Sequence, residues 1–253
     1  MKKLKVKDLV FNEGRPKICA SIVGKTEEEI FDELEVLKDI DFDLIEWRAD
    51  HYNKIEEFSK VQAILKRINK LNKALVFTLR SKEQGGAREL PKEIYFSLNH
   101  FVIQSGLIDL IDIELLQNQE QVKIIVKEAK NKNVKVIISD HDFNNTHPKE
   151  EILKRLYQMQ SLGSDINKIA LMAENEKDVL TLLEAALEMK KFEENQPTII
   201  ISMGNLGKIS RIAGELFGSC MTYGPAKKPS APGQIGVRDL REILDLLNPL
   251  SLE

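Results

Sequence analysis

From residue 17 onward, short runs of β-branched and other apolar residues alternate with longer, charged segments of amphipathic character. A short apolar run predicts a buried strand, and an amphipathic segment of a dozen residues predicts a helix. Thr26 ahead of Glu29 reads as a capping box, and Pro148 suits the first turn of a helix. The predicted strands are Lys17–Val23, Asp43–Arg48, Ala74–Arg80, Leu107–Glu114, Val134–His141, Asn167–Ala173, Thr198–Met203 and Ser219–Tyr223. The predicted helices are Lys25–Asp39, Glu56–Asn72, Pro91–Ser105, Gln119–Lys132, Pro148–Leu162, Glu176–Phe192, Leu206–Phe217 and Val237–Leu247.

This alternation of strand and helix, eight times over 253 residues, indicates an α/β fold of the (β/α)8 TIM barrel type. Leu4–Gly14 falls outside the alternation, and we expect it to form a short N-terminal β-hairpin that closes the barrel bottom. An open doubly wound sheet is the alternative, although no Gly-x-Gly-x-x-Gly motif follows the first strand. Since no linker, repeat or low-complexity segment divides the chain, we expect a single TIM-barrel domain over residues 1–253.

The strand ends carry polar residues on one face. Side chains alternate across a strand, so residues two apart point the same way. In a barrel such a polar face points inward, and its C-terminal mouth is where active sites lie. Each residue alone could have a purely structural role, such as an ion pair at the rim, but charges from five strands together favour an active site. The residues sharing a face are Glu46 with Arg48, Thr78 with Arg80, Asp112 with Glu114, Ser139 with His141, and Lys168 with Ala170 and Met172.

Lys168 is the most informative of these residues, because it lies in the otherwise apolar run Asn167–Ala173. A strand that ends in solvent at its lysine is one explanation. Alternatively, burial lowers a lysine pKa and frees the amine to attack a carbonyl, which forms a Schiff base. His141 is the natural general acid and base beside it. Three arginines, Arg48, Arg80 and Arg211, suit carboxylates, so we expect a small anionic substrate.

Composition narrows the remaining possibilities. Hydrophobic residues make up 42%, charged residues 30%, and the formal net charge of -3 implies no nucleic acid partner. No apolar run approaches the roughly 18 residues of a membrane span, and no apolar signal core follows the basic N-terminus. We therefore expect a cytoplasmic protein without membrane contact. Cys19 and Cys220 are expected to be small buried hydrophobes, and we expect neither a metal nor another cofactor.

Eight short motifs carry a family resemblance over essentially the whole chain. Any one of them is weak, but their order and their barrel positions make the set specific. They are Gly14-Arg15-Pro16-Lys17-Ile18, Ile45-Glu46-Trp47-Arg48, Phe77-Thr78-Leu79-Arg80-Ser81, Asp109-Leu110-Ile111-Asp112-Ile113-Glu114, His141-Asp142-Phe143, Lys168-Ile169-Ala170, Ile209-Ser210-Arg211 and Ser230-Ala231-Pro232-Gly233-Gln234. With them the sequence resembles the type I 3-dehydroquinate dehydratases, the Schiff-base class of the shikimate pathway of aromatic amino acid biosynthesis.

The resemblance implies a reaction and a set of roles. Lys168 would form an imine with the C3 ketone of 3-dehydroquinate, and His141 would remove the C2 proton and help expel the C1 hydroxyl as water. Tyr223–Gly236 would be a lid, Arg211 the main partner of the substrate carboxylate, and the active form a homodimer. The implied substrate-binding residues are Ser21, Glu46, Trp47, Arg48, Arg80, Arg211, Ser230 and Gln234.

One position departs from the family in a way that bears on catalysis. Gln84 stands where the family has a glutamate that orients the histidine and tunes its basicity. Glutamine can accept a hydrogen bond from imidazole but carries no charge to stabilise an imidazolium. We therefore expect a lower His141 pKa than in typical relatives and a weaker proton transfer. Glu83 and Glu114 are the carboxylates that could replace it, and Asp140 faces away from His141 by parity.

Two other functions remain open at this point. A sugar-phosphate aldolase of the Schiff-base barrel type would need a phosphate cradle, for which Met203–Gly207 at a helix N-terminus is the candidate. A binding protein that has lost catalysis is the second, and Gln84 is its only support.

Overall fold

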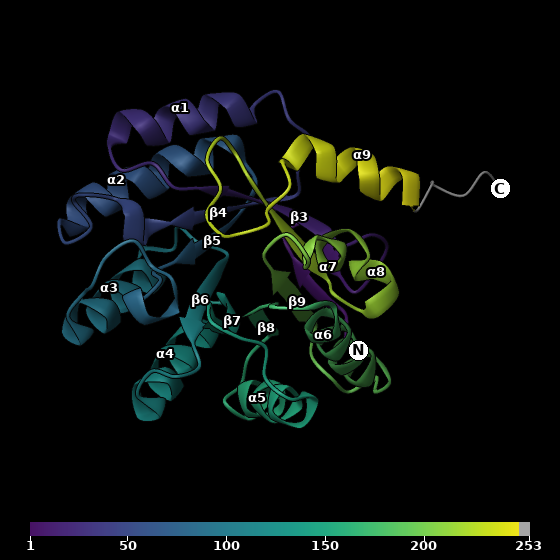
Figure 1. Cartoon of the computed structure of the whole chain (residues 1–253). Helices are drawn as coiled ribbons and strands as arrows, with labels where there is room; N and C mark the ends of the chain where they lie inside the picture. Colours follow the sequence, from purple (N-terminus) through teal and green to yellow (C-terminus); the bar gives the residue numbers. More distant parts are fainter. Residues whose placement is uncertain (248–253) are drawn as a thin grey trace.

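Eight parallel strands form a ring at the centre of the structure, a computed structural model that describes residues 1–247 (Figure 1). The hydrogen-bonded order is β10-β3-β4-β5-β6-β7-β8-β9, and a parallel bridge between Thr198 and Ser219 joins the two ends of the sheet. The strands are β3 (Lys17–Ile22), β4 (Leu44–Arg48), β5 (Ala74–Thr78), β6 (Leu110–Glu114), β7 (Lys135–Asp142), β8 (Ile166–Met172), β9 (Thr198–Met203) and β10 (Met221–Pro225).

Helices surround this ring on its outer side (Figure 1). The predicted (β/α)8 TIM barrel is therefore confirmed, and the open doubly wound sheet is wrong. The α-helices are α1 (Glu27–Leu37), α2 (Phe58–Ile68), α3 (Lys92–Ser105), α4 (Gln119–Asn131), α5 (Lys149–Ser161), α6 (Glu176–Lys190), α7 (Lys208–Ile212), α8 (Gly214–Phe217) and α9 (Val237–Leu247). Short 3-10 helices are η1 (Ala49–His51), η2 (Asn69–Leu71) and η3 (Lys82–Gln84).

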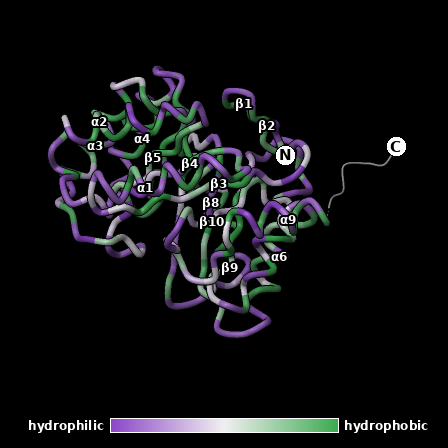
Figure 2. Tube along the Cα trace, turned by 90° about the horizontal axis from the view of Figure 1, so that it is seen from above, coloured by the Kyte–Doolittle hydropathy of each residue, from purple (hydrophilic) through white to green (hydrophobic). Residues whose placement is uncertain are grey.

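The two faces of the strands belong to two separate hydrophobic clusters, as the alternation of side chains predicts. Ile45 and Phe77 pack outward against the helices, whereas Leu44 and Val76 pack inside the barrel. Hydrophobic stretches run through the interior strands, and hydrophilic stretches mark the loops (Figure 2). Polar residues that share the inward parity are therefore delivered to the barrel mouth.

An antiparallel hairpin of β1 (Leu4–Val6) and β2 (Leu9–Phe11) lies outside the ring. Val6 and Phe11 are buried in the interior cluster with residues from the N-terminal ends of the strands. The hairpin thus covers the bottom of the barrel, as expected. Acidic side chains fix the same end: Asp165 accepts the backbone N–H of Val136 at 2.8 Å.

Element boundaries follow local chemistry. The Thr26 side chain accepts the backbone N–H of Glu29 at 3.2 Å and caps α1. The predicted single helix Leu206–Phe217 is wrong, because α7 and α8 are separate. The chain bends at Ala213, and Gly214, where an added Cβ would lie 3.2 Å from the Ser219 Cβ, begins α8. Within residues 1–247, no helix has the length and apolar character needed to cross a membrane. Residues 248–253 of the expected domain lie outside the described residues, and the single-domain prediction stays a prediction.

Candidate active site

One cavity lies at the C-terminal ends of the barrel strands and gathers nine of the eleven site residues expected from the sequence. The apolar part of its wall comes from Phe143, Ala170, Ile201, Met203 and Tyr223. The expected residues that line it are Glu46, Arg48, Arg80, Gln84, His141, Lys168, Arg211, Ser230 and Gln234. Five of these residues come from predicted strands for which parity gave an inward face: Glu46, Arg48, Arg80, His141 and Lys168.

Lys168 is only 4% exposed. Its ammonium donates to Asp112 Oδ2 at 3.0 Å and lies 3.6 Å from Glu46 Oε1. The same nitrogen lies 4.3 Å from the centre of the Tyr223 ring, a cation–π contact. The two carboxylates and the ring face thus surround the buried ammonium with partners for its positive charge. The alternative of a strand that ends in solvent at its lysine is wrong.

The two carboxylates beside Lys168 are themselves held by neighbouring strands. Glu46 accepts hydrogen bonds from Ser21 Oγ at 2.8 Å and Thr78 Oγ1 at 3.0 Å. Asp112 accepts one from Ser139 Oγ at 2.5 Å. Burial raises the pKa of Asp112, but the positive charges of Arg80 and Lys168 outweigh burial and hold that pKa well below its usual range. Asp112 therefore stays ionised beside the amine.

Arg80 and Arg211 differ in how their charges are balanced. Arg80 donates to Asp112 at 2.8 Å and to Glu114 at 3.1 Å, so two carboxylates of the protein neutralise it. Arg211 is 1% exposed and donates to the Pro232 carbonyl at 3.0 Å, and its Nε has no hydrogen-bond partner. Within residues 1–247 no carboxylate forms an ion pair with Arg211. Burial lowers its pKa to about 10, so it remains a cation at neutral pH. A buried, unpaired arginine that lines a cavity suits an anionic ligand.

His141 is oriented by Gln84. The Gln84 Oε1 atom lies 3.1 Å from the His141 backbone N–H, which donates to it, and 3.2 Å from the ring Nδ1. Because an amide oxygen can only accept a hydrogen bond, Nδ1 carries the proton and donates it to this bond, which leaves Nε2 as the free basic nitrogen. Burial lowers the pKa of His141 well below its usual value, and the charges of Arg80 and Lys168 act in the same direction. The imidazole is therefore neutral at neutral pH.

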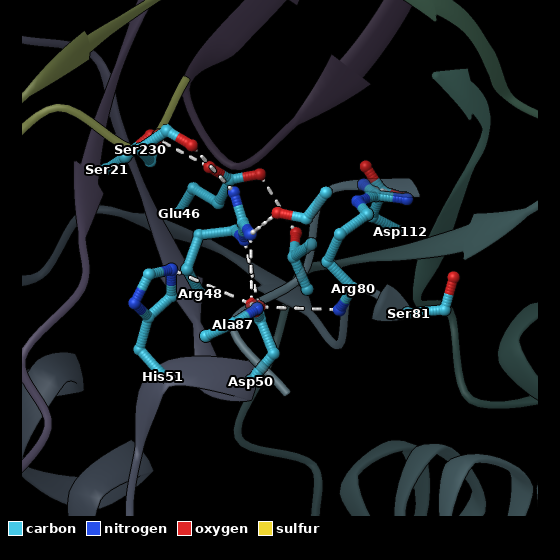
Figure 3. Close-up of polar contacts among 12 residues, drawn as sticks. Ser21, Glu46, Arg48, Asp50, His51, Arg80, Ser81, Ala87, Asp112 and Ser230 are labelled. Carbon is cyan, nitrogen blue, oxygen red and sulfur yellow. Dashed lines mark hydrogen bonds and ion pairs between the residues drawn. The ribbon is translucent and has the colours of Figure 1, made fainter. Parts of the chain in front are cut away.

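Arg48 reaches the cavity with a fixed orientation that comes from Asp50, a residue the sequence analysis missed. Its guanidinium makes a two-pronged ion pair with Asp50, with distances of 2.9 Å from Nε to Oδ1 and 2.9 Å from Nη2 to Oδ2 (Figure 3). Asp50 follows β4 directly and continues the alternation of Glu46 and Arg48. Extending the parity rule by two residues past the strand would have found it.

The segment between β10 and α9 closes over the cavity. The Gln234 side chain accepts the Ser230 backbone N–H at 2.7 Å and donates to Ser230 Oγ at 3.0 Å, which makes a compact loop. The Ser230 carbonyl lies 3.4 Å from Arg48 Nη1. Gly233 has φ +74° and packs so tightly that an added Cβ would lie 2.2 Å from the Gly204 carbonyl oxygen. This segment, residues 226–236, begins later than the expected lid, because Tyr223 belongs to β10.

Two expected substrate-binding residues are not on the cavity wall. Trp47 is fully buried on the helix side of β4, with its ring centre 5.7 Å from that of Phe77 and 6.1 Å from that of Tyr52. The prediction for Trp47 is wrong because its parity is opposite to that of its neighbours Glu46 and Arg48. Ser21 is also fully buried and does not line the cavity. Its hydroxyl donates to Glu46, and direct binding of substrate by Ser21 stays a prediction.

Asp140 behaves as parity predicts, because it pairs with Arg155 at 2.6 Å on the side away from His141. The other carboxylates considered near His141 are also accounted for. Glu114 binds Arg80, and Glu83 is exposed to solvent. Gln84 is therefore the residue that contacts the imidazole.

The chain is similar to known proteins over nearly its whole length. A family model described as type I 3-dehydroquinase matches residues 18–251. A 3-dehydroquinate dehydratase from Syntrophotalea carbinolica is 48% identical over 250 residues, which cover 98% of this chain and 99% of that protein. A 3-dehydroquinate dehydratase from Clostridium novyi is 45% identical over 250 residues, which also cover 98% of this chain and 99% of that protein. The structure of type I 3-dehydroquinate dehydratase from Clostridium difficile with covalently modified comenic acid superposes with a TM-score of 0.94, 47% identity and 98% coverage of both chains.

Proposed function

This chain belongs to the type I 3-dehydroquinase family, and from that premise we propose how its own residues carry the reaction. The reaction is the dehydration of 3-dehydroquinate to 3-dehydroshikimate in the shikimate pathway. We propose that the Lys168 ammonium gives one proton to the C3 carbonyl oxygen as its nitrogen attacks the C3 carbon. A second proton follows as the C–O bond breaks, so that water leaves and a protonated imine remains. The positive imine nitrogen withdraws electrons and makes the C2 proton acidic.

The proton transfers fall to His141 in this proposal. Its free Nε2 takes the C2 proton, and the electron pair left on C2 forms an enamine with the imine carbon. The enamine then expels the C1 hydroxyl, to which His141 returns the proton, so that one water leaves. A second water hydrolyses the imine, which releases 3-dehydroshikimate and restores the Lys168 ammonium.

The observation that carries the proposal is that a buried amine, a neutral imidazole and an unpaired arginine line one cavity. Arg211 would bind the substrate carboxylate, because it is the buried guanidinium without an acidic partner in the described part of the chain. Asp112 and Glu46 would stabilise the positive imine nitrogen that replaces the Lys168 ammonium. Arg48, Ser230 and Gln234 would bind the ring hydroxyls from the side of the lid.

Borohydride trapping tests the lysine directly. The protein is incubated with 3-dehydroquinate and reduced, and the added mass is located by peptide mass spectrometry. We expect the adduct on Lys168 and a rise of enone ultraviolet absorbance in the unreduced sample. Lys168→Met serves as the control and should show neither signal. An adduct on another lysine, or enone formation that survives Lys168→Met, contradicts the proposal.

The two alternative functions are less well supported. The candidate phosphate cradle, Met203–Gly207, is covered by Gly233 of the lid and leads into α7, a helix of only 5 residues. The loss of catalysis rested on Gln84 alone, and Gln84 still accepts from the imidazole through its oxygen. Both alternatives predict that no enone forms from 3-dehydroquinate, so the same absorbance measurement tests them.

We further propose that the chain acts in the cytoplasm as a homodimer on this small-molecule substrate, without a metal or other cofactor. The family membership supports this, and light scattering after size-exclusion chromatography measures the oligomeric state. A monomer at working concentration contradicts it.

A further inference from the structure

Asp50 is a fully buried carboxylate that touches more of the site than any role assigned so far requires. Besides its two-pronged pair with Arg48, it accepts the Ala87 backbone N–H at 2.9 Å and lies 3.4 Å from the Arg80 backbone N–H (Figure 3). Burial raises the pKa of Asp50, but the Arg48 charge and its hydrogen bonds outweigh burial and lower that pKa. The carboxylate is therefore ionised and every contact is that of an acceptor.

These contacts join β4 to the loop that follows η3. A side chain of the loop also binds the backbone of the Asp50 turn, since Arg88 donates to the Asp50 carbonyl at 2.9 Å and to the His51 carbonyl at 3.1 Å. Gly86 fits so closely that an added Cβ would lie 2.1 Å from the Arg80 carbonyl oxygen. The chain just after Gln84 is thus pinned at Ala87 and Arg88, both to the 3-10 turn that contains Asp50.

Gln84 is the residue through which this connection reaches His141. Its side chain contacts both the backbone and the ring of His141, and the Gly85–Arg88 loop follows it directly in the chain. The Asp50 carboxylate therefore binds both the Arg48 guanidinium and the Ala87 backbone N–H of the loop. Arg48 points into the cavity on one side of Asp50, and the partner of the general base stands on the other.

We propose that Asp50 is a positioning residue that fixes Arg48 in the cavity and, by anchoring the Gly85–Arg88 loop, keeps Gln84 against His141. The inference rests on the proposed function, because it assigns Asp50 to the binding and proton-transfer steps of that reaction. It makes substrate binding and orientation of the base depend on one side chain that does not touch substrate.

Asp50→Asn is the sharpest substitution, because it keeps the shape and removes the charge. An asparagine amide has one oxygen, so it cannot accept from both nitrogens of Arg48 and from Ala87 at once. Hydrogen bonds to charged groups are among the stronger ones, and we expect KM for 3-dehydroquinate to rise about tenfold and kcat to fall severalfold.

The pH profile separates this role from a purely structural one. The charged groups that bear on the His141 pKa are Arg80 from β5, Lys168 from β8, Asp112 from β6 and Arg48 from β4. Without the Asp50 charge the Arg48 cation is no longer neutralised, so the acid limb of kcat should move to lower pH. Asp165→Asn is the matched control: Asp165 accepts a backbone N–H at the barrel bottom, and its loss should lower the Tm without moving KM or the limb.

A double-mutant comparison tests whether Asp50 acts through Arg48. If it does, Asp50→Asn combined with Arg48→Gln should raise KM no further than Arg48→Gln alone. Independent, multiplying effects on KM overturn that part of the proposal. Should Asp50→Asn fail to fold, Arg88→Gln removes the contacts of the same loop with the Asp50 and His51 carbonyls and should lower kcat through the loss of Gln84 from His141.

Hydrogen exchange makes failure of the inference distinguishable from failure of the proposed function. If Asp50 anchors the loop, amides of residues 85–88 exchange faster in Asp50→Asn than in the wild type, whether or not the wild type turns over. Unchanged exchange there, or unchanged KM and kcat in both variants of a folded, active enzyme, overturns the inference. A wild type that forms no Lys168 adduct overturns the proposed function, and with it the role of Asp50 in that reaction.

Discussion

Buried charges at this site fall into two kinds, those balanced by the protein and those left for a ligand. Arg211 is of the second kind, since burial disfavours its charge and no carboxylate among residues 1–247 compensates. Its presence costs folding free energy that substrate binding can recover. A site that holds such a group unpaired exchanges stability for affinity.

Arg211→Met should therefore raise KM for 3-dehydroquinate by roughly two orders of magnitude, the effect of a lost charge-assisted pair. Its thermal stability should be equal to or above that of the wild type, because an unpaired buried cation has been removed. Arg80→Met is the comparison, because it strands Asp112 and Glu114 and should cost about 3–5 kcal/mol of folding free energy. Steady-state kinetics and thermal unfolding measure both. A large drop in the Tm of Arg211→Met contradicts this account.

Gln84 sets the pH range of the general base. The pKa of His141 lies well below its usual value, so the neutral imidazole persists below pH 6.5 and activity should fall only as pH drops through that lowered pKa. Gln84→Glu places a negative charge at the Nδ1 contact and raises the pKa, because the imidazolium is stabilised. We expect the acid limb of kcat to move to higher pH and turnover near neutrality to rise, by roughly tenfold.

Glu83→Gln is the matched control for that change. Glu83 is the neighbouring exposed carboxylate, and its neutralisation should leave both the limb and the turnover where they are. Turnover that is unchanged or lower in Gln84→Glu would refute the assigned role of the Gln84 position. An effect of Glu83→Gln equal to that of Gln84→Glu would show that Glu83 reaches the imidazole in solution.

At the scale of elements, the lid depends on a single glycine. Gly233 has φ +74°, and the Gly204 backbone lies against it without room for a Cβ. Gly233→Ala should therefore hold the loop of residues 226–236 away from β9, which removes Ser230 and Gln234 from the cavity. We expect KM to rise about tenfold with little change in the Tm, and faster proteolysis of this loop, since none of its residues is fully buried.

Gly106→Ala separates lid displacement from backbone strain. Gly106 also has a positive φ, +67°, but nothing lies within 4 Å of an added Cβ at the end of α3. It should cost about 1 kcal/mol of stability and leave KM unchanged. If Gly233→Ala binds substrate as the wild type does, the close packing of the lid on Gly204 is not needed for affinity.

The elements and the inward-facing residues could be predicted because both depend on the period of side chains along a strand. Glu46, Arg80, His141 and Lys168 were placed correctly by parity and motif order alone. Parity also contradicted the family-based expectation for Trp47, and the structure agrees with parity.

The remaining features could not be predicted because they arise from contacts between distant segments. Asp50 gains its importance from Ala87, 37 residues further along the chain. Whether an arginine is balanced depends on which acids reach it, so the sequence grouped Arg80 and Arg211 together. The break between α7 and α8 lies at Ala213, next to Gly214, which packs closely on Ser219. Such distances are set by the fold rather than by local pattern.

At the scale of the whole molecule, the barrel keeps its site at one end and a stabilising hairpin at the other. Phe11 is fully buried in the interior cluster at the barrel bottom. Phe11→Ala should cost about 3 kcal/mol or more and lower the Tm by roughly 10 °C, because the surrounding residues can fill the space only in part. KM and kcat at 25 °C should stay at wild-type values, since the cavity lies at the opposite ends of the strands. Leu216→Ala is the control: Leu216 is 67% exposed, so its truncation should change neither stability nor kinetics. Thermal unfolding and steady-state kinetics on the three proteins measure this, and a KM that rises in Phe11→Ala would mean that the two ends of the barrel are mechanically coupled.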